Sequence, residues 1–283
     1  MNINANTFVN IDADLAALQT TIDEKLQQEG DSIENAMQDP GFLSFMQNIF
    51  ANAVKDNVFF KNHPEIKSFL LYSPENYFLR NNAEEEYIKP LGTRGQGLLN
   101  CLKELYKNQE KFEQIQEALS LFDWFESIDI GTDRIFGEGE ITIKDRFLHD
   151  EAPIFDQRSA NEGFLYLLFY AALFVSDDTP AFFAIDNIDN GMNPRMCAKL
   201  IEVLSDLAEK NGKQVIFTTH NPAILDGLDL SDENQRLFVI SRNRKGRTKA
   251  KRIFKNNTPE GKIPTKLSEL FLRGSIGGLP ENF

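Results

Sequence analysis

The residues best suited to chemistry stand directly after two short apolar runs in the second half of the chain. The first run, AFFAI at 181–185, delivers Asp186 to what should be the carboxyl end of a buried strand. Open parallel sheets bind ligands at that edge, where a carboxylate beside a phosphate can hold Mg²⁺ through its waters. The same Asp186 can instead cap the next helix, so this segment by itself leaves both roles open.

The second run, QVIFTT at 214–219, is followed at once by His220, one of three histidines in the chain. A histidine just past a strand, on the same sheet edge as Asp186, can reach a terminal phosphate or an attacking water. The local pattern also fits a helix start, with Asn221 as N-cap and Pro222 at the first helical position. The two interpretations are compatible.

A third candidate is the start of a strongly apolar helix, where Asn161, Glu162 and Gly163 stand. The free backbone N–H groups and the positive end of a helix dipole can hold an anion there. Asn161 is also a good N-cap, so an ordinary helix start is the alternative.

The elements that must position these residues alternate between helix and strand. From residue 156 the pattern predicts helix, buried strand, helix, buried strand and helix, at 163–174, 181–185, 194–210, 214–219 and 222–228. Such alternation predicts a parallel sheet with crossover helices. Two later runs, 237–241 and 249–254, predict an antiparallel hairpin at the edge of that sheet.

The first half of the chain is mostly helical in pattern. Residues 1–65 carry apolar residues at spacings of three and four, which predicts a helical segment. The run 66–72, IKSFLLY, predicts a buried strand. One long helix is expected from Gly97 to Leu119, and short strands joined by turns are expected near 128–143.

The composition excludes several classes of protein. Of the 283 residues, 41% are hydrophobic and 24 are Phe, which rules out global disorder. Cys101 and Cys197 lack metal-ligand spacing and indicate a reducing compartment. No apolar run approaches the roughly 20 residues of a membrane span, and the start does not resemble a signal peptide. We therefore expect a cytoplasmic protein without membrane contact.

The balance of charge is acidic. A net charge of −13, from 30 Lys and Arg against 43 Asp and Glu, disfavours indiscriminate binding to nucleic acid. The local exception is a run of eight basic residues from Arg242 to Lys255. That run can contact DNA phosphates, or it can be the solvated face and turn of a hairpin. The second interpretation is favoured, because the run is not interleaved with aromatic residues that could stack on bases.

Taken in order, the three segments resemble the distal, C-terminal half of a bacterial ABC-type ATPase head, of the RecF/SMC/OLD-like group of AAA family ATP-binding proteins. ANEGFLYLLFYAALF looks like the signature helix, AFFAIDNIDNGMNP like a Walker B strand with its D-loop, and VIFTTHNPAIL like the switch-histidine strand. IKSFLLYSPEN, IKPLGTRGQGLLNCLKELY and LFLRGSIGGLPENF also resemble this group, so the likeness covers residues 66–283.

The resemblance implies an α/β fold, the mainly parallel sheet of a P-loop NTPase-like head. An N-terminal helical segment and a small strand-rich insertion would accompany that sheet. The implied divisions are a helical segment at 1–65, a middle part of the head at 66–155, and a part at 156–283 that carries the signature, Walker B and switch motifs.

The resemblance also implies ATP and Mg²⁺ as cofactors. Asp186 would hold the metal, Asn187 and His220 would occupy the catalytic positions, and Asn161, Glu162 and Gly163 would bind the nucleotide. In such heads ATP is held between two subunits, which implies a homodimer or a P-loop-bearing partner. Members of the group work beside nucleases or other effectors in genome maintenance or in defence against phage.

The chain departs from the family pattern in three places. A Walker A loop reads G-x-x-x-x-G-K-[ST], and neither Gly-Lys pair, at 212–213 and 261–262, fits it. Asn187 stands where the family has the Glu that activates water, and an amide cannot take a proton at neutral pH. Asn161 replaces the signature Ser, although an Asn can still donate a hydrogen bond to a phosphate.

We therefore expect weak nucleotide binding by the chain alone, and ATP hydrolysis only where a P-loop is supplied from elsewhere. The chain can be the C-terminal piece of a longer ATPase or a separate half that works with a P-loop-bearing partner. The alternative is a degenerate, non-catalytic ATPase-like interaction protein. Too few residues follow His220 to encode a nuclease domain.

Overall fold

A computed structural model describes residues 66, 68–81, 90–130, 141–148, 154–242, 247–255 and 265–277 of the protein. The chain divides into two compact units, Met1–Ser68 and Phe69–Phe283, and nearly all of the described residues belong to the second. The predicted helical segment 1–65 lies outside the described residues.

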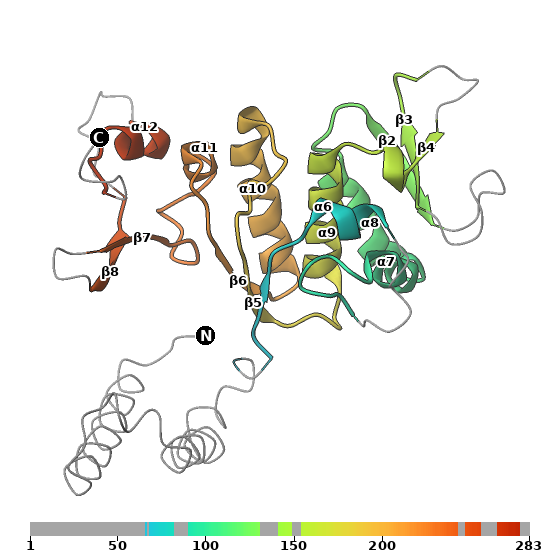
Figure 1. The fold of residues 1–283 in the computed structure, drawn as a ribbon, viewed down its shortest axis with the longest axis horizontal. Helices are drawn as coiled ribbons and strands as arrows, with labels where there is room; N and C mark the ends of the chain where they lie inside the picture. The colour runs from blue at the N-terminus through green and yellow to red at the C-terminus, as the bar shows by residue number, and fades with distance from the viewer. Residues whose placement is uncertain are drawn as a thin grey trace, which may run out of the picture. The chain divides into compact units, whose positions relative to one another are not determined.

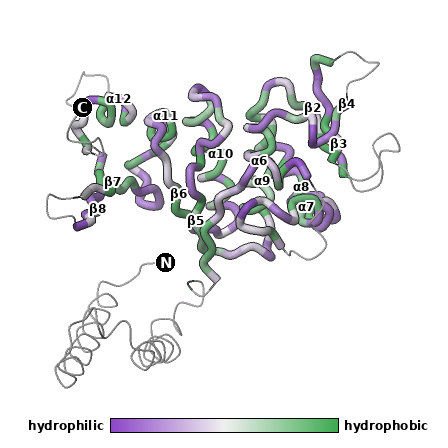
Figure 2. The backbone as a smooth tube through the Cα atoms, in the orientation of Figure 1, coloured by the Kyte–Doolittle hydropathy of each residue, from purple (hydrophilic) through white to green (hydrophobic). Residues whose placement is uncertain are grey.

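The centre of the second unit is a sheet of three parallel strands (Figure 1). Their order is β1 (Leu70–Tyr72), β5 (Phe182–Ile185) and β6 (Gln214–Phe217). Each strand comes from one of the short apolar runs of the sequence, and Figure 2 draws β5 as hydrophobic. The predicted α/β fold with a parallel sheet is confirmed.

The register of this sheet brings the carboxyl ends of its strands to one edge. Tyr72 lies opposite Ile185, and Ile185 lies opposite Phe217. Because the strands are parallel, the residues that follow β5 and β6 emerge side by side at that edge.

Helix α9 (Glu162–Val175) covers one face of the sheet. Its Phe174 ring lies 5.4 Å from the ring of Phe183 and 6.3 Å from the ring of Phe217. Almost every residue of α9 is buried, because helices pack against it as well as the sheet. Within the described parts of the chain, no helix combines the length and the apolar character that crossing a membrane requires.

Helix α10 (Pro194–Lys210) connects β5 to β6 and has the bounds that the sequence predicts. The side chain of Asn193 accepts a hydrogen bond from the backbone N–H of Arg195 at 3.0 Å and so caps the helix. The buried side of α10 is formed by Cys197, Leu200, Ile201, Leu204 and Leu207. The next helix, α11 (Pro222–Leu225), is shorter than expected.

The single long helix expected from Gly97 to Leu119 is wrong. The structure has two helices there, α7 (Leu98–Tyr106) and α8 (Gln109–Leu119). Asn108 leaves the helical conformation between them, and its side chain accepts from the backbone N–H of Lys111 at 3.2 Å. An N-cap inside an otherwise continuous apolar pattern therefore starts a second helix.

The expected strand-rich insertion is a second sheet, which is antiparallel. Its order is β2 (Phe125–Ile130), β3 (Ile141–Asp145) and β4 (Ile154–Asp156), followed by the short 3-10 helix η2 (Gln157–Ser159). Trp124 precedes β2, and its ring lies 5.1 Å from that of Phe164 on α9. The tryptophan is partly buried and packs against the main hydrophobic core. The short helix α6 (Asn76–Arg80) follows β1 and also contacts α9.

The C-terminal hairpin is present but does not join the central sheet. Strands β7 (Leu237–Arg242) and β8 (Thr248–Ile253) pair with each other, and within the described residues they pair with no other strand. The expectation of a hairpin at the sheet edge is therefore wrong. A small separate core holds the hairpin near α11 and α12 (Leu267–Leu272), and its buried members are Leu225, Val239, Ile253 and Ile276.

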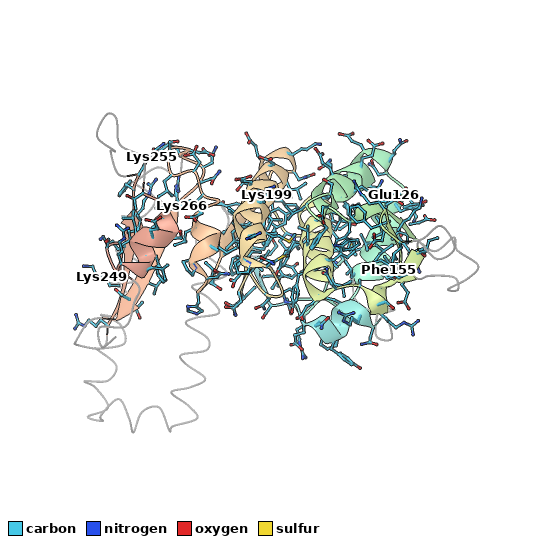
Figure 3. The ribbon with its side chains drawn as sticks, turned by 90° about the horizontal axis from the view of Figure 1, so that it is seen from above. Glu126, Phe155, Lys199, Lys249, Lys255 and Lys266 are labelled. Carbon is cyan, nitrogen blue, oxygen red and sulfur yellow. The ribbon has the colours of Figure 1, made fainter. Side chains whose placement is uncertain are left out.

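The basic run lies on this hairpin, and Figure 3 shows Lys249, Lys255 and Lys266 on the part of the chain that carries β8 and α12. Two members have acidic neighbours. Arg252 lies 3.5 Å from Glu233, and Lys255 lies 4.0 Å from Asp229. The turn 243–246 lies outside the described residues. Contact between this run and nucleic acid stays the less favoured of the two interpretations.

We expect the change Phe174→Ala to lower the free energy of unfolding by about 3–5 kcal/mol, because it opens a cavity between α9 and the sheet. The urea midpoint of the pure protein measures this loss. Phe147→Ala is the matched control, since that ring is 71% exposed and its removal should change the midpoint little. Equal effects of the two changes would contradict the packing of Phe174 between α9 and the sheet.

Candidate functional site

Asp186 is the first residue beyond β5, and both neighbouring strands anchor it. Its backbone N–H donates to the carbonyl oxygen of Tyr72 at 2.8 Å. Its side-chain Oδ1 accepts a hydrogen bond from the hydroxyl of Thr218, and its Oδ2 accepts from Nδ2 of Asn187 at 3.2 Å. The carboxylate is therefore held at the carboxyl edge of the sheet, where it is partly exposed.

Helix capping, the alternative role for Asp186, is wrong because Asn193 caps the following helix. The metal-binding role stays a prediction. Within the described residues, no group of three His, Cys, Asp or Glu side chains is arranged to hold a metal ion. A magnesium ion at Asp186 would take its other ligands from water and from a phosphate.

Thr218 joins the ends of β5 and β6. Its hydroxyl donates to Asp186 and accepts a hydrogen bond from the backbone N–H of Asn187 at 2.9 Å. Its backbone N–H donates to the carbonyl of Ile185 at 3.0 Å, and its carbonyl accepts from the N–H of Ile188 at 3.1 Å. One residue thus fixes both the carboxylate and the backbone that follows it.

Asn187, predicted to occupy a catalytic position, has an unusual backbone. Its φ of 51° makes it the sole non-glycine residue with positive φ among the described residues. Asn tolerates this left-handed conformation better than most residues because its short polar side chain can hydrogen-bond locally. This backbone conformation gives a structural reason for the Asn at position 187, where the family that the sequence resembles has a Glu.

His220 lies at the same edge, two residues beyond Thr218. Its imidazole is exposed, and within the described residues it has no hydrogen-bond partner. The predicted helix start follows it, since the side chain of Asn221 accepts from the N–H of Ala223 at 3.0 Å and Pro222 opens α11. The cap thus orients the backbone just after His220 and leaves its ring accessible.

Asp189, the next carboxylate after Asp186, is engaged with the residue before His220. Its Oδ1 accepts from the hydroxyl of Thr219 at 2.6 Å, and that hydroxyl also accepts from the N–H of Asn221 at 3.0 Å. Nearby, burial raises the pKa of Tyr170 well above its usual range, and the charge of Asp189 adds to the effect. Asp189 therefore positions the segment that carries His220.

The start of α9 lies against the loop that follows Asp186. A Cβ atom added to Gly163 would come within 2.6 Å of the carbonyl oxygen of Gly191, and Gly191 itself has a φ of +68°. Asn161 acts as the N-cap, because its Oδ1 accepts from the N–H of Phe164 at 2.7 Å. The cap uses the carbonyl oxygen, so the predicted role of Asn161 as a donor to phosphate would use its amide nitrogen.

Neither cysteine is suited to nucleophilic chemistry. Burial raises the pKa of Cys101 to about 12. Burial and the charge of Asp189 also raise the pKa of Cys197, whose Sγ lies 3.5 Å from the carbonyl of Asn193. Both thiols therefore stay protonated at neutral pH.

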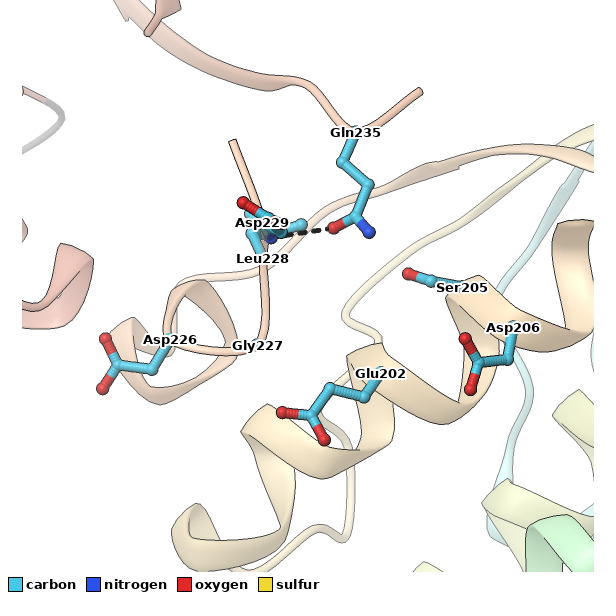
Figure 4. Close-up of a pocket in the computed structure, with 8 residues that line it drawn as sticks. All are labelled: Glu202, Ser205, Asp206, Asp226, Gly227, Leu228, Asp229 and Gln235. Carbon is cyan, nitrogen blue, oxygen red and sulfur yellow. Dashed lines mark hydrogen bonds between the residues drawn. The ribbon is translucent and has the colours of Figure 1, made fainter. Parts of the chain in front are cut away.

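A pocket of about 340 Å³ lies elsewhere, between α10 and the segment that follows α11 (Figure 4). Its acidic lining residues are Glu202, Asp206, Asp226 and Asp229. Asp226 is occupied as a hydrogen-bond acceptor for the backbone and the hydroxyl of Ser268. None of the predicted site residues lines this pocket.

A family model described as "AAA domain, putative AbiEii toxin, Type IV TA system" matches residues 25–226 of the chain. The match spans well over half of the 283 residues and includes all of the predicted site residues. The chain belongs to this AAA-domain family. The family resemblance seen in the sequence is thereby confirmed.

Several solved structures are similar to this AAA-domain protein. One comes from work on the structural biochemistry of ATP-driven dimerization and DNA-stimulated activation of SMC ATPases. It is 17% identical to this chain, with a TM-score of 0.37, and the similarity covers 52% of this chain and 88% of that one. The SMC head domain from Thermotoga maritima is 16% identical, with a TM-score of 0.37, covering 55% of this chain and 52% of the other.

The Smc head domain derived from Pyrococcus furiosus, bound to the C-terminal domain of ScpA, is 14% identical with a TM-score of 0.39. The similarity covers 55% of this chain and 37% of that one. No curated protein matches the chain.

Sequence reasoning missed the two hydroxyls that organise this site of the AAA-domain protein. Thr218 and Thr219 bond to Asp186 and Asp189 respectively. A signal for them exists in the sequence, since two adjacent threonines precede His220 at the end of a strand next to the one that ends in Asp186. The close approach of Gly163 and Gly191, which leaves no room for a side chain at Gly163, cannot be recognised from the sequence in a comparable way.

We expect Thr218→Val to lower the free energy of unfolding by about 1 kcal/mol, because it removes one donor and one acceptor that serve the neighbouring strand. Thr218→Ser keeps the hydroxyl and should lower the free energy of unfolding clearly less. Chemical denaturation of the two variants measures the difference. If valine and serine have the same effect, the shared hydroxyl is not a stabilising contact.

We expect Asn187→Glu to destabilise the protein by about 1–2 kcal/mol, because a longer side chain adopts the left-handed conformation less readily. Asn187→Gly should be nearly neutral. Asn190→Glu is the matched control, since it adds the same charge to the same loop at a residue without positive φ. Thermal unfolding of the three variants tests the ranking, and an equal loss in both glutamate variants would contradict it.

Proposed function

We propose that the chain forms the distal part of an ATP site whose P-loop comes from a segment or partner outside this sequence. Asp186 holds Mg²⁺ through its waters, His220 contacts the terminal phosphate, and Asn161, Glu162 and Gly163 contact a nucleotide across a dimer. The supporting observation is the Thr218 bridge, which ties Asp186 to the strand that carries His220.

The surroundings of Asp186 suit a water-bound cation. The two groups that bond to its carboxylate, a threonine hydroxyl and an asparagine amide, are both neutral. Its negative charge is therefore not cancelled by a hydrogen-bonding partner and stays available to attract Mg²⁺. A single carboxylate with phosphate oxygens and waters is a common way to hold this ion.

The surroundings of His220 suit contact with a ligand. Its exposed imidazole follows a strand end that Thr219 ties to Asp189, so its backbone is fixed and its ring is accessible. An imidazole in this place can donate to a phosphate oxygen or position a water. The nucleotide itself supplies the phosphoryl group when it is bound, and the chain's residues orient it.

A second candidate is nucleotide binding without turnover, in an ATPase-like interaction protein. The observation that favours it is the amide of Asn187 at the position of the expected base. Hydrolysis then requires another group to accept the proton of the attacking water. Asp189 is engaged with Thr219, which disfavours it as the replacement.

The wider role follows from the family resemblance. The family's description names a putative toxin of a type IV toxin–antitoxin system. We propose that the chain acts beside an effector, such as a separate nuclease, in phage defence or genome maintenance.

The test is equilibrium binding of a fluorescent ATP analogue with Mg²⁺. We expect the chain alone to bind weakly, and its mixture with the polypeptide encoded immediately upstream to bind at least about tenfold more tightly. Asp186→Asn should remove the dependence of this binding on Mg²⁺ because it removes the charge that attracts the ion. Asp206→Asn makes the same change on the exposed side of α10 and serves as the control.

Three outcomes of this experiment are decisive. Tight, Mg²⁺-dependent binding by the isolated chain would contradict the need for an outside P-loop. Equal binding by the Asp186→Asn and Asp206→Asn variants would contradict the role of Asp186. If the mixture binds the analogue, and a phosphate-release assay of the same mixture with ATP detects no turnover, the second candidate is correct.

A further inference from the structure

The hydroxyl of Tyr170, on α9, is buried without a hydrogen-bond partner. The residue is fully buried, and its Oη bonds to no other group within the described residues. A buried hydroxyl in this state costs free energy, and native structures keep few of them. A partner that the hydroxyl meets in another arrangement of the same residues would explain why the chain has Tyr and not Phe at this position.

The loop that carries Asp189 lies along the side of α9 to which Tyr170 belongs. Glu162, Tyr166 and Tyr170 follow one another at intervals of four residues and share one side of the helix. A Cβ atom added to Gly191 would come within 3.0 Å of Glu162 and 3.1 Å of Tyr166. The ring of Tyr170 lies one turn further along, 6.2 Å from the ring of Tyr166. Asp189 precedes Gly191 by two residues, and its charge adds to the effect of burial in raising the pKa of Tyr170.

The carboxylate of Asp189 is only partly engaged. Its Oδ1 accepts from the hydroxyl of Thr219 at 2.6 Å, whereas its Oδ2 accepts no hydrogen bond within the part of the chain that the structure describes. A change of rotamer can redirect a carboxylate without moving the backbone. Asp189 therefore has one hydroxyl as its present partner and a second, unpartnered hydroxyl on the neighbouring helix.

We propose that Asp189 has two positions and that Tyr170 is its partner in the second. In the first position, which this structure shows, Asp189 accepts from Thr219. In the second position it accepts from the hydroxyl of Tyr170, and the hydroxyl of Thr219 loses its acceptor. Because Thr219 stands directly before His220, the exchange releases the segment that carries the imidazole. Tyr170 is thus a positioning residue that acts through Asp189 and touches no ligand itself.

The two positions are balanced in their hydrogen bonds. Each contains one bond from a neutral hydroxyl to the carboxylate and leaves the other hydroxyl without that bond. The hydroxyl of Thr219 keeps one bond in the second position, because it also accepts from the N–H of Asn221 at 3.0 Å. A ligand that contacts His220 better in one position than in the other would therefore shift the balance between them.

The test is a double-mutant cycle on the full chain without nucleotide, so its result is independent of the proposed ATP site. In the wild-type chain, we expect Tyr170→Phe to leave the urea midpoint unchanged or to raise it, because the hydroxyl has no partner. In the Thr219→Val chain, Asp189 turns to Tyr170. There we expect Tyr170→Phe to raise the equilibrium constant of unfolding about fivefold, because it removes the new hydrogen bond.

Two further backgrounds serve as controls. Thr218→Val removes the neighbouring hydroxyl, which bonds to Asp186 and leaves Asp189 with its partner. Thr219→Ser keeps the hydroxyl that Asp189 uses. We expect Tyr170→Phe to have the same effect in both of these chains as in the wild type.

A crystal structure of the Thr219→Val chain measures the exchange directly. We expect an oxygen of Asp189 about 2.7 Å from Oη of Tyr170. A carboxylate that stays away from Tyr170 in this variant would overturn the proposal, as would an equal effect of Tyr170→Phe in all four backgrounds. A lower urea midpoint of Tyr170→Phe in the wild-type chain would also overturn it, since a water or another group would then already bond to the hydroxyl.

Discussion

The hydroxyl of Thr218 is the contact on which the carboxyl edge of the sheet depends. Backbone pairing brings the ends of β5 and β6 together, but it does not fix the direction of the side chains that follow. Thr218 does so, because it donates to Asp186 and accepts from the N–H of Asn187. The acidic side chain and the left-handed turn after it are therefore set by one residue on the neighbouring strand. The ends of β5 and β6 are therefore one structural unit.

The two carboxylates at this edge have neutral hydrogen-bonding partners. Its carboxylates, Asp186 and Asp189, accept hydrogen bonds from neutral donors, and the start of α9 presents backbone N–H groups that suit an anion. In the proposed ATP site, these groups would meet the magnesium ion and the phosphates.

The sequence predicts the parallel sheet and α10 well, because apolar periodicity and the cap residues Asn193 and Pro194 act locally. It also predicts that Asp186 and His220 share one edge, since alternating strands and helices leave few arrangements. Prediction from the sequence fails where contacts elsewhere in the fold override the local pattern, or where no local pattern exists. The Asn108 cap divides an apolar pattern that looks continuous. The hairpin β7–β8 packs on a separate small core, whose members come from segments distant in the sequence. Nothing in the pattern of residues predicts the positive φ of Asn187.

The close approach of Gly163 and Gly191 has a mechanical consequence. With no side chain between them, the first turn of α9 and the loop after Asp186 touch backbone to backbone, and neither can shift without displacing the other. Asn161, just ahead of that turn, is exposed at the surface. A displacement of the first turn of α9 would therefore also move the loop that contains Gly191, and with it the segment that begins at Asp186.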